Sequence, residues 1–154
     1  MPIQKPAITN ACPNSVRIAE ILSTLPHRFP FLLVDRVVDY QAGRALEARK
    51  LVTANEHYMA SESQFFPSVL IVEAMAQATG ILAVLSAEEV SADSRFFLIG
   101  VDRTSFSGHV EAGDQLAIQV RVLRITQGVG KFQAEASVGG VQVAIAELMC
   151  AAQI

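Results

Sequence analysis

The sequence of 154 residues has no tryptophan, only two cysteines and a charged share of only 18%. Cys12 and Cys150 lie far apart and lack the close spacing of metal-binding pairs, so we expect reduced thiols and no metal site. The net charge is −3 and the basic residues are dispersed, which argues against a nucleic-acid partner. No uninterrupted apolar run reaches the about 20 residues of a membrane span, so we expect no membrane insertion.

Apolar residues are abundant instead, at 51% of the chain, with a mean hydropathy of +0.37. A chain this apolar that does not cross a membrane hides the surplus surface in a subunit interface or an acyl-binding tunnel, so we expect an obligate oligomer. Residues 1–154 are expected to form a single domain. Residues 1–14 hold three prolines and predict a loose arm. They lack the apolar segment of a signal peptide, so we expect a cytoplasmic protein.

The most apolar stretch, residues 69–85, predicts one long helix. Ser68 is expected to cap its first turn through the side-chain hydroxyl. A helix that is apolar on every side is buried on every side. Glu73 and Gln77 are the exceptions, one turn apart on the same face. Because a carboxylate is costly to bury unless it is paired, protonated or used, we place the chemistry at Glu73.

The rest of the chain predicts a short helix followed by strands on both sides of the long helix. Short turns rich in glycine, such as Gly139-Gly140, join antiparallel neighbours. With only one helix available to cover a sheet, we predict an α+β fold in which a curved antiparallel sheet wraps around the central helix. The open edge of such a sheet is most simply protected by pairing with a second copy. The expected segments are a helix at 16–23 and strands at 31–40, 45–53, 96–101 (continuing extended through 104–110), 115–125, 131–138 and 141–150.

Four blocks of the sequence resemble one known family. Residues 25–37 (LPHRFPFLLVDRV), 69–80 (VLIVEAMAQATG), 98–102 (LIGVD) and 113–116 (GDQL) are similar, in this order, to the bacterial 3-hydroxyacyl-acyl-carrier-protein dehydratases. The resemblance covers the chain from about residue 16 to its end. It implies the hot-dog fold, a homodimer with two shared acyl tunnels and, in many members, a trimer of dimers. It implies no cofactor, and a substrate carried on acyl carrier protein or CoA.

The family's reaction removes water from a (3R)-3-hydroxyacyl thioester in fatty-acid or polyketide-type metabolism. It uses a histidine as base toward C2 and a helix carboxylate that handles the departing hydroxyl. The carboxylate matches Glu73. The histidine lies in a Gly-His-Phe-Pro-Gly segment, and here the corresponding loop, residues 55–68 (NEHYMASESQFFPS), is about three residues shorter and lacks that segment. His57 in this loop is therefore a tentative substitute base, against the alternative of a surface histidine.

The remaining candidates surround the start of the long helix. Free N–H groups at Ser68 and Val69 could hold a thioester carbonyl, unless the Ser68 hydroxyl occupies one of them. Gln77 is expected beside the substrate, on the face of Glu73. His27 belongs to the first resemblance block, and we expect a structural role for it.

Three functions remain open from the sequence. The first is a dehydratase with altered acid–base machinery led by Glu73. The second is a thioesterase, because hot-dog relatives can hydrolyse thioesters with a single helix carboxylate. The third is a non-catalytic acyl-carrier-binding subunit paired with a histidine-bearing homologue.

Overall fold

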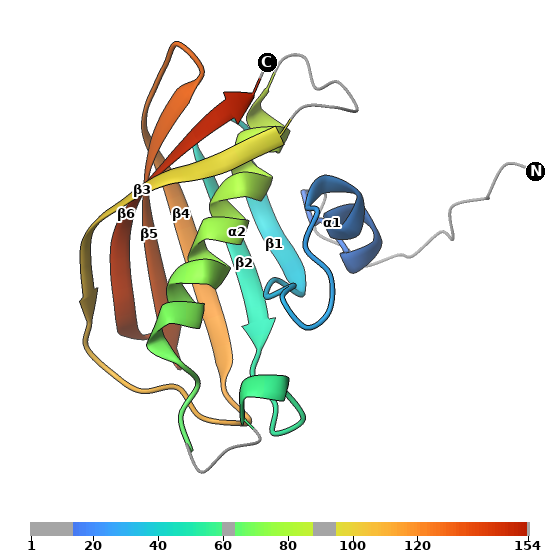
Figure 1. Ribbon diagram of the computed structural model, residues 1–154, viewed down its shortest axis with the longest axis vertical. Coiled ribbons are helices and arrows are strands. Elements are labelled where there is room, and N and C mark those ends of the chain that lie inside the picture. The colour runs from blue at the N-terminus through green and yellow to red at the C-terminus, as the bar shows by residue number, and fades with distance from the viewer. Residues whose placement is uncertain (1–13, 60–63, 88–94, 154) are drawn as a thin grey trace, which may run out of the picture.

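The computed structural model describes residues 14–59, 64–87 and 95–153. The arm predicted for residues 1–14 lies outside the described residues except for Asn14. A single six-stranded sheet curves around one long helix (Figure 1). The elements in chain order are α1 (Ile18–Thr24), β1 (Arg36–Gln41), β2 (Ala45–Leu51), the 3₁₀ turn η1 (His57–Met59), α2 (Ser68–Ser86), β3 (Arg95–Phe106), β4 (Gln115–Thr126), β5 (Val129–Val138) and β6 (Val141–Gln153).

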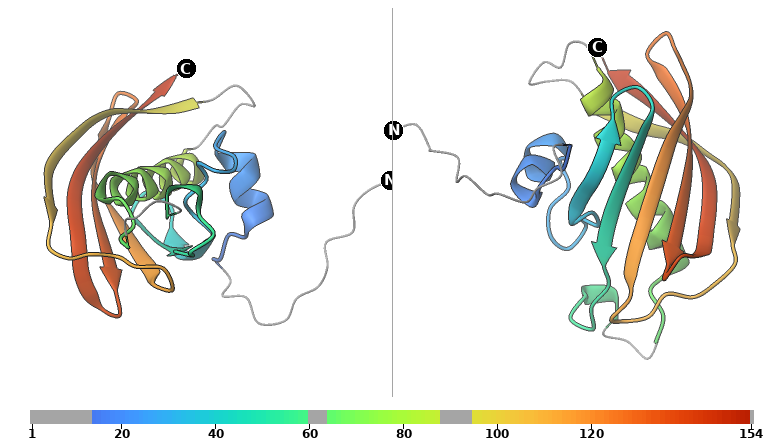
Figure 2. Two further views of the ribbon diagram at one scale, coloured as in Figure 1. Left: turned by 60° about the horizontal axis from the view of Figure 1, so that its bottom comes forward. Right: turned by 180° about the vertical axis from the view of Figure 1, so that it is seen from behind.

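Every pairing in the sheet is antiparallel, in the order β1-β2-β4-β5-β6-β3. Gly139 and Gly140 both have positive φ, at 57° and 82°, which lets β5 turn tightly into β6. The sheet wraps around α2, while α1 lies beside the open side of the wrap (Figure 2). The α+β fold predicted from the sequence, with a curved antiparallel sheet around one helix, is confirmed.

The core lies between α2 and the inner face of the sheet. Alternate residues of β4 are buried, as the period of two in that segment predicts. Where α2 crosses the sheet, both surfaces carry alanine, including Ala74 and Ala78 on the helix and Ala134 and Ala146 on the strands, all fully buried. Such small side chains let the helix backbone approach the sheet closely. Larger residues fill the flanks, and burying each stabilises the fold by about 1.5–3 kcal/mol. They include Phe132, Leu148, Leu116 and Ile118.

Several boundaries differ from the sequence prediction by a few residues, and two differences at the site have a local cause. The first strand begins at Arg36 rather than at residue 31, because the backbone at Phe31 and Leu33 bonds to the Gln77 side chain instead of to a strand. The Leu33 N–H donates to Gln77 Oε1, and the Phe31 carbonyl accepts from Gln77 Nε2. The predicted cap at Ser68 is wrong: Pro67 is the N-cap, and no side chain of the described residues caps the helix start.

Strand β3 forms one edge of the sheet and pairs only with β6 in the described part of the chain. The strand itself runs over 12 residues without a break. Its register with β6 shifts at two places. Its large apolar side chains are exposed by 42–54%. A long apolar edge is a ready template for pairing with another chain. These residues are Phe97, Leu98, Ile99, Val101 and Phe106.

Helix α2 is the single described helix that is long and apolar enough to cross a membrane. Half of its most apolar window is buried inside the protein. It contacts β2, β3, β4, β5 and β6, which explains its composition as that of a core helix.

Three charged side chains tie strands β3, β5 and β6 together. Glu147 Oε2 forms an ion pair with Lys131 Nζ at 2.6 Å, and Glu147 Oε1 accepts from Arg103 Nη1 at 3.0 Å. The hydrogen bond from Lys131, with the two positive charges, holds the pKa of Glu147 below its ordinary value of 4.5. Because the folded-state pKa is lowered, this stabilisation is complete above about pH 4.5 and is lost as the pH falls through the lowered pKa.

We therefore expect Glu147→Gln to lower the melting temperature at pH 7. The difference from the wild type should shrink as the pH falls through the lowered pKa of Glu147, because the wild-type carboxylate then becomes protonated too. Melting curves across this range test it. A difference that stays constant with pH would show that Glu147 stabilises the fold through packing instead of charge.

Candidate active site

Glu73 lies in the first half of α2, at the wall of a cavity, where its side chain is 36% exposed. The same turn of the helix brings Gln77 beside it, and Gln77 Nε2 donates to Glu73 Oε1 at 2.8 Å. The carboxylate is therefore oriented and only partly solvated.

Gln77 is 2% exposed, and both the nitrogen and the oxygen of its amide form hydrogen bonds within the chain. Besides Glu73, its Nε2 donates to the Phe31 carbonyl at 2.7 Å, while its Oε1 accepts from the Leu33 N–H at 2.8 Å. The side chain thus joins α2 to the segment that precedes β1. Although Gln77 lines the cavity, its observed contacts position Glu73 and the chain around it.

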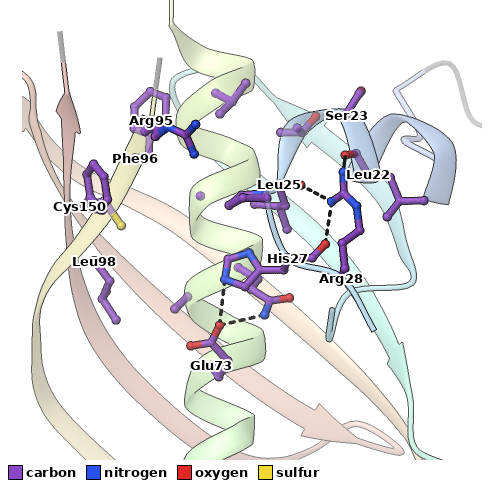
Figure 3. Close-up of a pocket in the computed structure, with 17 residues that line it drawn as sticks. Leu22, Ser23, Leu25, His27, Arg28, Glu73, Arg95, Phe96, Leu98 and Cys150 are labelled. Carbon is purple, nitrogen blue, oxygen red and sulfur yellow. Dashed lines mark hydrogen bonds and ion pairs between the residues drawn. The ribbon is translucent and has the colours of Figure 1, made fainter. Parts of the chain in front are cut away.

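The third member of the group is His27, for which we expected only a structural role. Its Nε2 lies 3.4 Å from Glu73 Oε1, and its side chain is 34% exposed (Figure 3). The neighbouring Arg28 holds this loop in place by donating to three carbonyls at the end of α1. Its guanidinium reaches the carbonyls of Leu22, Leu25 and His27 at 2.7–2.8 Å. A cation is favourable at this helix end, where carbonyls lack helical partners.

The cavity beside Glu73 and His27 has a volume of about 510 Å³, within the range of small-molecule sites. Its walls come from the end of α1 and the loop after it, from one face of α2, from the start of β3 and from Cys150 on β6. On α2 this face carries small residues, Ala76 and Gly80. A second cavity of about 110 Å³ shares Phe96 and Cys150 with it. His27 and Glu73 therefore face a space with both polar and apolar walls that extends along the helix.

The other predicted residues lie elsewhere. Ser68 and Val69 form the exposed first turn of α2, with Val69 exposed by 70%, and neither lines this cavity. His57 is exposed on η1 and does not line it either. Their proposed roles stay predictions.

A buried network explains why η1 is held in its place. Lys50 is 7% exposed at its side chain and donates to Glu56 at 2.7 Å and to the Leu51 carbonyl at 2.9 Å. Tyr58 donates its hydroxyl to the same carboxylate. Burial, followed by the hydrogen bond and charge of Glu56, raises the pKa of Tyr58, so this hydroxyl stays protonated. The network fixes the loop around His57 without directing it to Glu73.

No group of three or more residues that could hold a metal ion occurs within residues 14–59, 64–87 and 95–153. The carboxylate of Glu73 and the imidazole of His27 are the pair of side chains that the cavity brings together.

A curved antiparallel sheet wrapped around one central helix is the arrangement of the hot-dog fold. Solved structures share the fold. The dehydratase heterocomplex ApeI:P from Xenorhabdus doucetiae superposes with a TM-score of 0.73 at 22% identity, over 87% of this chain and 91% of that one. The Escherichia coli PaaI protein superposes with a TM-score of 0.64 at 15% identity, over 79% and 80%.

The sequence comparisons then identify the family. A FabA-like domain model matches residues 25–147, and the chain belongs to this family. It is 47% identical to the 3-hydroxyacyl-[acyl-carrier-protein] dehydratase FabZ of Shewanella woodyi over 141 residues, 90% of this chain and 93% of the relative. It is 45% identical to FabZ of Actinobacillus pleuropneumoniae over 145 residues, 92% of this chain and 94% of the relative.

Proposed function

We propose that this protein removes water from 3-hydroxyacyl thioesters to give 2-enoyl thioesters. The observation that carries the proposal is the Glu73 carboxyl, held by Gln77 at the wall of a cavity of about 510 Å³ whose apolar wall follows α2 and the start of β3. The two FabZ relatives, similar along nearly the whole chain, support the same chemistry. As their names state, they act on acyl groups carried by acyl carrier protein, and we propose acyl carrier protein or CoA as the carrier here.

In this reaction Glu73 acts on the hydroxyl at C3. The protonated carboxyl gives its proton to that oxygen as the C3–O bond breaks, and the hydroxyl leaves as water. The electron pair of the C2–H bond forms the new double bond, and the C2 proton goes to a base. A positioned acid contributes about 10²–10⁴-fold to such a step.

We propose that two copies of the chain pair through β3. The exposed apolar side chains of this edge would then be covered, and the strand's free backbone groups would find partners. Assembly of such dimers into a hexamer is a further proposal. Size-exclusion chromatography with light scattering tests both: a monomer at micromolar concentration would contradict the pairing.

Hydration of crotonyl thioester tests the function in the reverse direction. The conjugated double bond absorbs in the ultraviolet, so its loss reports addition of water, while a coloured thiol reagent in a parallel sample reports hydrolysis. The proposal expects loss of absorbance with no thiol release. Thiol release without hydration would instead identify a thioesterase. Neither signal, with any chain length, would leave the acyl-carrier-binding subunit as the better account.

The acyl chain is expected to lie along α2 past Gly80. A Cβ placed on Gly80 would lie 3.6 Å from the Leu25 side chain, an ordinary contact, so a larger side chain can enter the cavity without disturbing the backbone. Leucine also has a helix propensity about 0.8–1 kcal/mol better than glycine. We expect Gly80→Leu to fold well and to occlude the cavity.

Its activity on long acyl chains should then fall by about tenfold or more, while activity on crotonyl thioester stays close to that of the wild type. The measurement is kcat/KM for a series of chain lengths. The short substrate serves as the internal control. Equal losses for every chain length would show that the acyl group does not lie along this face of α2.

A further inference from the structure

The imidazole of His27 is the titratable group that the structure places against Glu73. Both side chains face the same cavity, and the distance between His27 Nε2 and Glu73 Oε1 is 3.4 Å. His27 follows α1, whose end is held by Arg28, while Glu73 lies on the buried central helix. Two elements fixed independently therefore bring an imidazole and a carboxyl to one point.

The other ring nitrogen of His27, Nδ1, has no contact among the described residues that fixes which nitrogen carries the proton. Nδ1 of His27 is buried and has no hydrogen-bond partner in the part of the chain that the structure describes. In many catalytic histidines a carbonyl or carboxylate binds Nδ1–H and fixes which nitrogen is the base. Without such a partner, Nε2 can either accept a proton or donate one to Glu73.

The other charged or titratable groups at this cavity cannot take a proton near neutral pH. Arg28 and Arg95 carry guanidinium groups, which stay charged. Burial raises the pKa of the Cys150 thiol to about 11, so it stays protonated. Of the described residues that line the cavity, His27 and Glu73 are the imidazole and the carboxyl that lie against each other.

We propose that His27 supplies the base for the C2 proton, in the role for which the loop of residues 55–68 offers no matching histidine. This inference rests on the proposed dehydratase function and deepens it. With substrate bound in the cavity against both side chains, neutral His27 Nε2 takes the C2 proton. The C2–H electron pair forms the double bond, and protonated Glu73 gives its proton to the leaving hydroxyl. His27 then returns its proton to Glu73, which restores the pair.

The experiment uses the full chain with His27→Ala and the more conservative His27→Gln, both checked by thermal melting. Both variants are expected to lower kcat/KM for crotonyl thioester hydration by about 10²–10⁴-fold. The bell-shaped pH profile of the wild type should lose one limb. Added imidazole should restore part of the activity of His27→Ala, because the missing ring leaves space that opens to the cavity. Substituted imidazoles should restore it according to their basicity.

His57→Gln and His109→Gln, which change the two other histidines of the chain, are measured in parallel. Loss and rescue at His27 support the proposal. Wild-type activity in His27→Gln, or loss without rescue and with an unchanged pH profile, would overturn it and leave the dehydratase function intact. A loss confined to His57→Gln would overturn it in favour of the loop. An inert wild type would overturn the proposed function and the role of His27 together.

Discussion

Replacing Glu73 by glutamine is expected to lower kcat/KM for crotonyl thioester hydration by about 10²–10⁴-fold. The substitution keeps the size of the side chain, and its carbonyl can still accept the hydrogen bond from Gln77 Nε2. It removes the ionisable proton, so the group can neither deliver a proton to the C3 oxygen nor exchange one with His27. The fold should be unaffected, with a change in unfolding free energy of less than about 1 kcal/mol.

Glu135→Gln is a suitable control. Glu135 lies on β5 and interacts with Gln133, away from the cavity, and the change has the same chemistry. It should retain wild-type activity. Unchanged hydration in Glu73→Gln would contradict the assignment of Glu73, whereas equal losses in both variants would indicate a general effect on the protein.

Gln77→Met is expected to have the largest combined effect on stability and activity. The change keeps the length of the side chain but leaves the Leu33 N–H and the Phe31 carbonyl without their partner. A buried polar group that loses its partner costs about 1–3 kcal/mol. We expect a loss of about 2–5 kcal/mol in unfolding free energy, measured by urea denaturation, together with lower kcat because Glu73 is no longer oriented.

Thr79→Val offers a matched control on the same helix. Thr79 is fully buried, but its hydroxyl donates only to the Met75 carbonyl within α2. Its replacement should cost less than about 1 kcal/mol, because that carbonyl already belongs to the helix hydrogen-bond ladder. Similar losses in both variants would show that Gln77 acts as one more buried polar residue instead of as the link between α2 and the segment before β1.

The fold could be predicted because its signals are local. The apolar run of α2, the alternation in β4 and the glycine pair before β6 each determine a helix, a strand or a turn by themselves. Glu73 could be predicted for the same reason, as the only carboxylate in that run. The start of β1 could not, because the backbone around Leu33 bonds to Gln77, which lies 44 positions later in the chain.

The proximity of His27 to Glu73 could not be predicted for a comparable reason. Nothing local in residues 25–37 indicates that the ring faces Glu73, since this requires α1 and α2 to pack together. The available signal is the residue type, an imidazole within the first block of resemblance in a chain whose loop 55–68 lacks the family's histidine segment. The loop itself offers only His57, which is exposed on η1.

Incubation of the purified protein with a (3R)-3-hydroxybutyryl thioester, followed by mass spectrometry of the intact thioester, tests the account most directly. The account predicts a product lighter by one water with its thioester bond kept, formed by the wild type and much more slowly by Glu73→Gln. Free acid and free thiol in place of that product, or an unchanged substrate, would contradict it.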